Sequence, residues 1–249
     1  ERVLRAVQVL VDEGLARPVV CGRPSVVEKR IQQLGLRIRI DRDFELVNPL
    51  SDPRYNDYWR LYHEIMERKG VTPDRARTVV RTDATVIGAL ALLRGDADSM
   101  ICGVEGQYHN HLRHVENIIG KAEGVHDLSA LSLLITPRGT FFLADTYVTE
   151  SPSVEDIVET TRLAAEAVRR FGIRPKIALL SHSNFGSHKD TSARKMREAV
   201  RRLHALDPEL EVDGEMHADS ALSEDIRKRN FPNSRLTGSA NLLIMPGLD

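Results

Sequence analysis

The sequence predicts an α/β fold made of two α/β domains, each a three-layer αβα sandwich around a mostly parallel sheet. Short apolar runs alternate along the chain with segments whose apolar residues recur at helical spacing, which is typical of strand-helix-strand units. The polar segment 120–124, which contains two glycines, separates a region of mostly helical spacing from a region that opens with two β-like runs. We therefore expect a first domain over residues 1–122 and a second over residues 123–249, with a cleft between them.

The composition indicates a folded protein that binds neither a membrane nor a nucleic acid. Its 249 residues are 41% hydrophobic and 29% charged, with a formal net charge of -1. A chain of this length can bury a sizeable core, whereas a nucleic-acid binder usually carries a basic excess. No apolar run approaches the roughly 20 residues of a membrane span. Cys21 and Cys102 are too few for a disulfide framework, which fits the reducing cytoplasm that we expect as the location.

Each element expected in the first domain follows from local spacing or from capping residues. Thr72 precedes Pro73 and Asp74, and this order predicts a helix start: a hydroxyl caps the helix, proline fits its first turn, and an acid suits its positive end. Apolar residues spaced three and four apart indicate the other helices. We expect helices over 1–14, from Pro24, over 53–69, from Thr72, over 86–93 and over about 108–119, and strands over 18–21, 36–40, 44–47 and 99–102.

The second domain is expected to open with a hairpin and then to alternate strands with helices. Two β-like runs, 128–135 and 140–144, are separated by Pro137-Arg138-Gly139. Ser153 and the acids that follow it predict the start of a long helix ending at Gly172. Beyond it we expect strands over 176–180, 210–213 and 241–245 and helices over 191–205 and 218–229.

The two ends of the sequence predict a fragment of a larger fold. The chain begins on a helix with no strand before it, so we expect the first domain to lack its N-terminal strand. It ends shortly after the apolar run 241–245, although a parallel unit normally adds a crossover helix after such a strand. The alternative is that this last strand lies at a sheet edge, where a long apolar strand would invite aggregation.

The loop 181–187 is the first candidate for chemistry. It reads Ser-His-Ser-Asn-Phe-Gly-Ser and follows the apolar strand 176–180. In open α/β sheets ligands bind at the carboxyl ends of strands, where hydroxyl and backbone N–H groups can hold phosphate or carboxylate oxygens. The loop therefore indicates an anion site, with an ordinary polar turn as the alternative.

A second candidate is a group of histidines and an arginine at the start of the expected helix 108–119. His111 and His114 share a helix face, but His109 does not join them, and no carboxylate completes a recognised metal pattern. We therefore expect no metal there. Arg113 is the stronger candidate because a guanidinium suits phosphate and carboxylate, with a surface ion pair as the alternative.

A third candidate follows the expected strand 210–213. Asp213, Glu215 and His217 could perform acid-base chemistry, but a turn and capping role is the alternative that we favour. The sequence contains no dinucleotide-binding glycine motif, no P-loop and no nucleophile elbow.

Several segments, taken together and in order, resemble the phosphotransacetylase (phosphate acetyl/butyryl transferase) family over essentially the whole chain. More narrowly, the run from Arg113 to Gly120, the loop 181–187 and the segment 213–217 are similar to the phosphotransacetylase-like C-terminal domain of hybrid NADP-dependent malic enzymes. The segments that carry the family resemblance are 1–6, 103–113, 152–156, 178–187, 212–215 and 232–234.

This resemblance implies two α/β domains of the phosphotransacetylase or isocitrate-dehydrogenase type with a cleft between them. In the family the last segment of the chain returns to the first domain, and that return segment is absent here. The resemblance also implies acetyl-CoA as the ligand and no metal in this chain. The residues that it assigns to acetyl-CoA are Arg113, Tyr108, Ser181, Ser183, Asn184, Phe185, Gly186 and Ser187.

Two departures from the family pattern concern catalysis. The family usually carries an arginine four residues before the glycine matched by Gly70, where this sequence has Met66. Active members carry a Thr-Lys pair where this sequence has Asn184 and Phe185. Neither a thioether nor an aromatic ring can neutralise an acyl phosphate, so we expect no catalytic residue in this chain.

These observations favour a regulatory and oligomerisation domain that binds acetyl-CoA and acts on a malic-enzyme domain of the same polypeptide. We expect a homo-oligomer. NADP and Mg²⁺ or Mn²⁺ would belong to the other domain, which would convert malate to pyruvate and CO₂. An active phosphate acetyltransferase is the alternative, and a purely structural oligomerisation module is a third interpretation.

Overall fold

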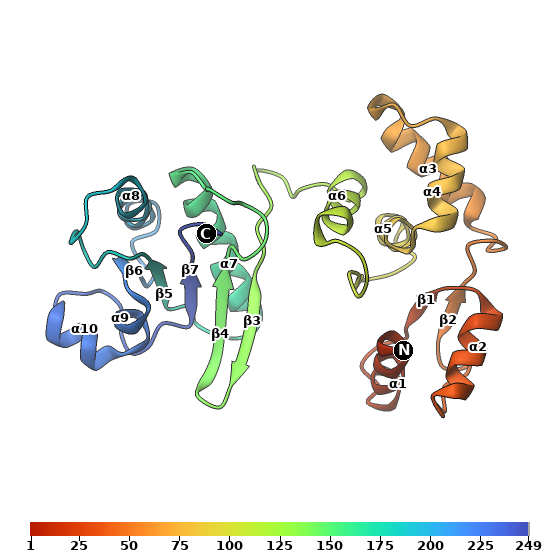
Figure 1. Cartoon of the computed structure of the whole chain (residues 1–249), viewed down its shortest axis with the longest axis horizontal. Coiled ribbons are helices and arrows are strands. Elements are labelled where there is room, and N and C mark those ends of the chain that lie inside the picture. Colours follow the sequence, from red (N-terminus) through yellow and green to blue (C-terminus); the bar gives the residue numbers. More distant parts are fainter. Residues whose placement is uncertain (249) are drawn as a thin grey trace. The chain divides into compact units, whose positions relative to one another are not determined.

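A computed structural model describes residues 1–248 as two compact units, each with its own hydrophobic cores (Figure 1). The first unit is Glu1–Lys121 and the second begins at Ala122. The division falls within the glycine-bearing segment 120–124. Among the described residues, none of the helices combines the length and the apolar composition needed to cross a bilayer.

The first unit is mostly helical and contains a small parallel sheet. Two apolar clusters hold it together, one around Phe44 beneath the first two helices and one around Tyr58 and Leu90 between the later helices. Its helices are α1 (Arg2–Asp12), α2 (Pro24–Gln33), α3 (Tyr55–Met66), the 3-10 helix η1 (Glu67–Lys69), α4 (Pro73–Thr82), α5 (Ala84–Arg94) and α6 (Tyr108–Ile118), and its strands are β1 (Val19–Cys21) and β2 (Glu45–Val47).

The helix start predicted at Thr72 is confirmed. Its side chain accepts a hydrogen bond from the backbone N–H of Arg75 at 3.3 Å, and Pro73 occupies the first turn of α4. The helix α5 ends at Gly95, whose φ of 77° lies in the left-handed region that favours glycine. The local capping rules therefore place these boundaries correctly.

Two strands predicted in this unit are wrong. Over 36–40 two backbone amides bond to side chains instead of to a neighbouring strand: Arg37 N–H donates to Gln8 Oε1 and Arg39 N–H donates to Asp43 Oδ2, both at 2.7 Å. Ile40 forms an isolated bridge with Phe44. The segment 99–102 is also irregular, with Ile101 92% exposed. Alternating or apolar residues form a strand only where another strand is available to pair with them.

The second unit is a five-stranded sheet with the strand order β3-β4-β7-β5-β6. The strands β3 and β4 form the predicted antiparallel hairpin, and the remaining neighbours are parallel. The strands are β3 (Ser132–Thr136), β4 (Gly139–Ala144), β5 (Ile177–Leu180), β6 (Val212–Met216) and β7 (Leu242–Ile244), and the helices are α7 (Val154–Arg170), α8 (Thr191–Leu206), α9 (Ala218–Leu222) and α10 (Glu224–Asn230).

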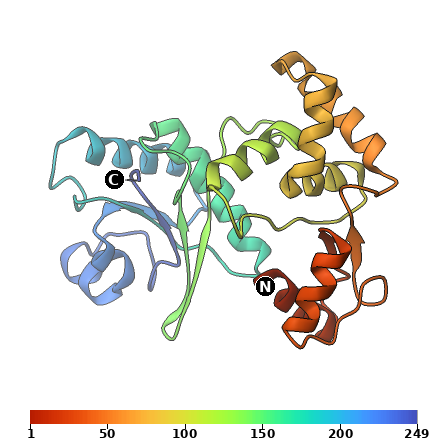
Figure 2. The same ribbon diagram turned by 45° about the vertical axis from the view of Figure 1, so that its right-hand side comes forward.

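The second unit has three layers (Figures 1 and 2). Ile177 and Leu179 on one face of β5 join an apolar cluster with α7 and α8, whereas Ala178 and Leu180 on the other face join a cluster that includes Ala221 of α9. Because successive side chains of a strand point to opposite faces, a fully apolar strand requires helices on both faces. The predicted mixed α/β architecture is confirmed.

The strand β7 pairs with both β4 and β5, so it lies inside the sheet, and the alternative that placed it at a sheet edge is not found. Two expectations for this unit need correction. The strand β6 extends beyond residue 213 to Met216. The predicted helix 218–229 is divided at Ser223, which ends α9 and caps α10 by accepting a hydrogen bond from the Ile226 N–H.

Candidate functional site

The carboxyl ends of four parallel strands of the second unit meet at one edge of its sheet. The strands β4, β7, β5 and β6 all run the same way, so the segments that follow them share that edge. The loop 181–190 follows β5, and His217 follows β6. This edge is where open α/β sheets bind ligands, and it carries the predicted anion loop.

A bulge in β6 aims Glu215 at the loop. Leu179 pairs with Gly214 and Leu180 pairs with Met216, so Glu215 is the extra residue between them. Glycine is required at position 214 because a Cβ there would lie 2.6 Å from the backbone oxygen of Leu179. Bulges of this kind redirect a side chain beside functional sites.

The fully buried carboxylate of Glu215 holds the loop in place. Its Oε1 accepts hydrogen bonds from Ser183 Oγ at 2.7 Å and from the Gly186 N–H at 2.8 Å. The Arg197 guanidinium of α8 donates to both carboxylate oxygens, at 2.8 and 3.0 Å. Burial alone would raise the pKa of Glu215, but these donors outweigh it and hold the pKa below its usual value. Glu215 therefore stays ionised and anchors the loop to β6 and α8.

Two of the predicted ligand-binding groups already have partners within the protein. Ser183 is fully buried, and its Oγ donates to Glu215 and accepts from the His188 N–H at 3.0 Å. The backbone N–H of Gly186 also donates to Glu215. Both donors fix the shape of the loop in this structure, and their assignment to acetyl-CoA stays a prediction.

The outer part of the loop is more accessible. Ser187 is exposed, and its Oγ accepts a hydrogen bond from the Asn184 N–H at 3.0 Å. Asn184 Oδ1 accepts from the His217 N–H at 2.8 Å, which leaves its amide N–H₂ group as a donor. Ser181, half-buried at the end of β5, accepts from the Ser183 N–H at 3.1 Å. These side chains can donate hydrogen bonds to an anionic ligand.

Phe185 turns back into the molecule. Its ring lies 4.6 Å from that of Phe231, and it packs against the apolar cluster beneath the loop. Its φ of 45° lies in the left-handed region, and Gly186 follows at 96°. Phe185 is therefore a packing residue at the turn, with no charge to offer a ligand.

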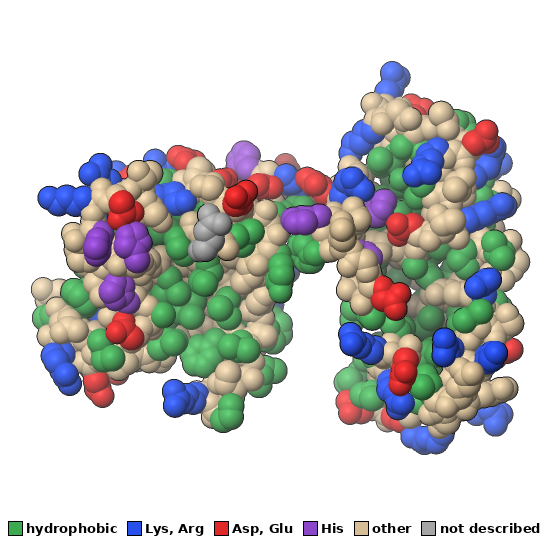
Figure 3. Space-filling view, in the orientation of Figure 1, with side chains coloured by type: hydrophobic (Ala, Val, Ile, Leu, Met, Phe, Trp, Pro, Cys, Tyr) green, Lys and Arg blue, Asp and Glu red, His purple; other side chains and the backbone are tan. Residues whose placement is uncertain are grey.

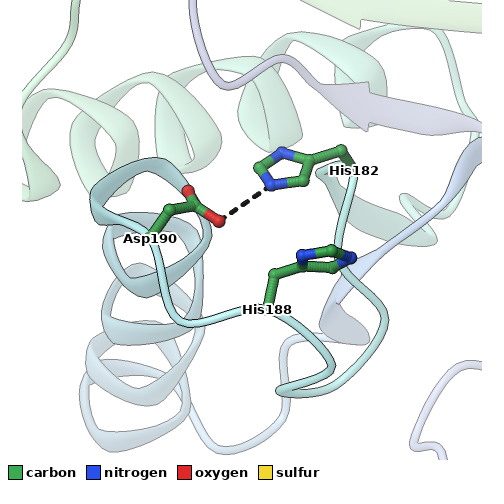
Figure 4. A group of neighbouring side chains, drawn as sticks. All are labelled: His182, His188 and Asp190. Carbon is green, nitrogen blue, oxygen red and sulfur yellow. Dashed lines mark hydrogen bonds and ion pairs between the residues drawn. The ribbon is translucent and has the colours of Figure 1, made fainter.

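Histidine side chains gather beside α8 and β6 on this unit (Figure 3). His182 Nε2 lies 2.8 Å from Asp190 Oδ2, and the ring of His188 lies next to that of His182 (Figure 4). Asp190 caps α8 by accepting from the Ala193 N–H, which together with His182 lowers the pKa of Asp190 to about 2. Over residues 1–248, these three side chains are the group whose ligand atoms lie close enough to hold a metal.

The remaining predicted residues, Tyr108 and Arg113, lie on α6 of the first unit. Arg113 is exposed, and its guanidinium donates to Asn110 Oδ1 at 3.3 Å. No carboxylate of residues 1–248 forms an ion pair with Arg113, so the surface ion pair considered as its alternative role is not found. Tyr108 is 43% exposed at the start of the same helix, with its ring edge against His109.

The histidines of α6 serve the first unit itself. His111 Nδ1 lies 2.8 Å from Thr85 Oγ1, and its Nε2 lies 2.7 Å from the backbone oxygen of Glu105. His114 forms an ion pair with Asp83 at 3.2 Å when it is protonated. With both ring nitrogens of His111 engaged, this group does not assemble into a set of metal ligands.

Met66, at the end of α3, is buried in the apolar cluster of the first unit. The cations that follow it in sequence point elsewhere: Lys69 Nζ donates to Asn117 Oδ1 at 2.5 Å, and Arg68 is exposed beside Glu67. The thioether is thus a core side chain, as expected for an apolar residue at a helix end.

Two structural anchors escape sequence reasoning. Arg197 lies within an ordinary amphipathic helix, and nothing in its spacing indicates a partner on β6. Asp145 follows β4 at the same sheet edge and accepts backbone hydrogen bonds from residues 130 and 147–149. Its position directly after a predicted strand is the available signal, since acids there often hold turns.

Comparisons with known proteins agree with this architecture. The chain is 59% identical to the NAD-dependent malic enzyme of Rhizobium meliloti and 52% identical to the NADP-dependent malic enzyme of Escherichia coli; each match covers 100% of this chain but only 32% and 33% of those proteins. The chain therefore spans about a third of the length of these relatives. A phosphotransacetylase from Streptococcus pyogenes superposes with a TM-score of 0.87 at 29% identity, covering 99% of this chain and 74% of that structure.

The match to a protein family extends over the whole sequence. Residues 1–249 match the family described as phosphate acetyl/butaryl transferase. This agrees with the resemblance drawn from the loop 181–187 and the other motifs. The chain belongs to the phosphate acetyl/butaryl transferase family.

Proposed function

We propose that this chain is a regulatory domain that binds acetyl-CoA and transmits its occupancy to a malic-enzyme domain of the same polypeptide. Its malic-enzyme relatives are about three times as long as the part that it matches, which supports a multidomain parent. The parent would decarboxylate malate oxidatively with a nicotinamide cofactor, NADP in our expectation, and Mg²⁺ or Mn²⁺. The residues for that chemistry would lie outside this chain.

The observation that carries this proposal is the packing of Met66 and Phe185. The family resemblance expects a cation near each of these positions, and each instead holds an apolar side chain packed in a cluster. Stabilising the charge that develops on an acyl phosphate requires preorganised cations or hydrogen-bond donors. A chain that has lost two of them is better suited to hold acetyl-CoA than to transfer its acetyl group.

The groups suited to contact the ligand are accessible or partly accessible side chains among the residues assigned to acetyl-CoA. Arg113 supplies a guanidinium without a carboxylate partner among residues 1–248, which suits a phosphate of coenzyme A. Asn184, Ser187 and Ser181 supply accessible polar groups, and Tyr108 supplies an accessible ring. Ser183 and Gly186 then contribute by holding the loop, and Phe185 by packing under it.

An active phosphate acetyltransferase is the second candidate, favoured by the similarity to the Streptococcus pyogenes phosphotransacetylase. That activity would move acetyl between coenzyme A and phosphate. It requires neutralisation of the negative charge of the acyl phosphate, and the side chains of Met66 and Phe185 carry neither a positive charge nor a hydrogen-bond donor. Formation of acetyl phosphate by this chain would therefore favour the second candidate over the first.

The direct test is a calorimetric titration of the chain with acetyl-CoA. We expect saturable binding, and we expect Arg113→Ala to weaken it at least about tenfold, since a hydrogen bond to a charged group contributes about 1.5 to 3 kcal/mol. The matched control is Arg17→Ala, which removes another exposed arginine that makes no ion pair with residues 1–248. Absence of binding, or equal binding by both variants, would refute the assignment of Arg113.

Regulation requires acetyl-CoA to bind two states of the parent with different affinity, a difference of about 1 to 3 kcal/mol in typical cases. The test is malate decarboxylation by the full-length parent with and without acetyl-CoA. We expect a change in rate that Arg113→Ala abolishes. A response that survives in Arg113→Ala would place the effector site elsewhere.

A further inference from the structure

The group formed by His182, His188 and Asp190 has the chemistry of a metal site. One ligand atom of each side chain lies within 4.8 Å of those of the other two, and all three residues are exposed. They come from the loop 181–190 of the second unit: His182 lies near its start, His188 near its end, and Asp190 directly before α8 (Figure 4). None of the three belongs to the residues assigned to acetyl-CoA.

The spacing of the ligand atoms fits a shared divalent cation. Two ligands bound to Zn²⁺ at about 2.0 to 2.2 Å lie roughly 3 to 3.5 Å from each other. His182 Nε2 and Asp190 Oδ2 lie 2.8 Å apart, and the ring centroids of His182 and His188 are separated by 5.1 Å. Small side-chain rotations of these exposed residues therefore suffice to bring three ligands around one ion.

The backbone that carries these ligands is already fixed. The His188 N–H donates to Ser183 Oγ, and its carbonyl accepts from Arg197 Nη2 at 3.1 Å. The carbonyl of His182 lies 2.8 Å from His217 Nε2. Through Ser183 and Arg197, this stretch rests on the buried carboxylate of Glu215. A preorganised stretch loses less conformational entropy when it binds an ion.

The ligand groups are also chemically available. The imidazole nitrogens of His188 make no hydrogen bond to any residue from 1 to 248. Asp190 offers two carboxylate oxygens. Its Oδ1 caps α8 by accepting from the Ala193 N–H at 3.0 Å, while Oδ2 faces His182. One oxygen can therefore bind an ion while the other keeps the helix cap.

We propose that His182, His188 and Asp190 form a binding site for a divalent transition-metal ion of the Zn²⁺ class. Two imidazoles and one carboxylate are a ligand set that such ions use, with further positions open to water. The ion would join the loop to the first turn of α8. This proposal does not rest on acetyl-CoA binding, so either can fail without the other.

The test is a titration of the metal-free chain with ZnCl₂ followed by calorimetry, and with CoCl₂ followed by visible absorption. We expect one ion per chain at this site and a melting temperature that rises with Zn²⁺ concentration, because an ion that binds only the folded state stabilises it. No heat and no absorption change over the titration would overturn the proposal.

Two variants locate the ion. His188→Ala removes an exposed ligand, and Asp190→Asn removes the carboxylate charge but keeps a good helix cap. We expect each to weaken Zn²⁺ binding at least about tenfold, the scale of loss seen even for outer-sphere metal-site residues. The control His109→Ala removes an exposed histidine of α6 and should bind as the unaltered chain does.

The outcomes separate clearly. Melting temperatures without metal that match the unaltered chain show that each variant is folded. If His188→Ala and Asp190→Asn bind Zn²⁺ as tightly as the control, the ion lies elsewhere and the proposal is wrong. If only these two lose binding and the Co²⁺ absorption, the site is the one proposed.

Discussion

Glu215 is the residue on which the loop 181–190 depends. Its carboxylate is fully buried and accepts hydrogen bonds from Ser183, Gly186 and Arg197. Removing one partner from such an arrangement leaves the others buried without an acceptor, which costs more than the interaction itself contributes. Glu215 therefore positions the loop of the candidate site.

We expect Glu215→Gln to lower the free energy of unfolding by about 2 to 3 kcal/mol, because the glutamine amide has one accepting oxygen and cannot replace both carboxylate oxygens that Arg197 contacts. The loss stays in this range because Arg197 retains some contact with water. The control is Glu198→Gln, whose carboxylate pairs with Arg201 and Arg202 on the exposed side of α8. We expect that change to cost less than about 1 kcal/mol. Urea denaturation measures both, and equal losses would contradict the role given to Glu215.

The lowered pKa of Glu215 also predicts how stability depends on pH. The folded chain keeps this carboxylate ionised to lower pH than the unfolded chain does. Its contribution is thus complete above the ordinary glutamate pKa of about 4.3 and is lost as the pH falls through the lowered value.

We therefore expect the difference in unfolding free energy between the unaltered chain and Glu215→Gln to be constant near neutral pH and to shrink below about pH 4. Denaturation curves collected over this range measure it. A difference that grows on acidification would show that the pKa of Glu215 is raised instead.

At the scale of single residues, the sequence predicts which residues form the loop but not which of their hydrogen-bond donors are already used inside the protein. The loop 181–187 is predicted as a group of donors, yet the donors of Ser183 and Gly186 are used inside the protein. Their partner Glu215 belongs to a strand about 30 residues further along, and Arg197 to the helix between them. Side-chain pairing over such separations has no local signal.

At the scale of elements, the bulge in β6 is what turns Glu215 toward the loop. Gly214 permits it, because its φ of 142° and the close oxygen of Leu179 leave no room for a side chain. The predicted strand 210–213 stops short of this bulge, since Gly214 there resembles the end of a strand.

We expect Gly214→Ala to destabilise the chain by at least about 1 kcal/mol more than Gly172→Ala does. Gly172 follows α7 with a φ of 72°, and a Cβ added there would meet no atom within 4 Å, so its variant reports backbone strain without a clash. The two free energies of unfolding, measured side by side, isolate the contact with β5. Equal losses would show that the bulge tolerates a side chain.

Helices with caps are predictable, and strands without partners are not. Thr72 and Ser153 start helices as expected, and Ser153 forms a full capping box with Asp156. The runs 36–40 and 99–102 have the apolar content of strands, but in the structure the first makes an isolated bridge from Ile40 to Phe44 and the second is irregular. Pairing is decided by tertiary structure, which a local pattern does not contain.

At the scale of the whole molecule, family membership agrees between motifs, fold and relatives. The malic-enzyme relatives carry this domain within a longer polypeptide, and the phosphotransacetylase relative is named as an enzyme in its own right. The two proposed functions differ in one property, whether a bound acetyl group is transferred. Homo-oligomer formation and a cytoplasmic location stay predictions.

The most direct measurement follows thiol release from acetyl-CoA in the presence of phosphate, at concentrations where calorimetry shows the chain to be saturated. With apolar Met66 and Phe185 in place of cations, we expect bound acetyl-CoA and no thiol release above that of buffer alone. Steady release of coenzyme A with formation of acetyl phosphate would contradict the regulatory function and make this chain a transferase.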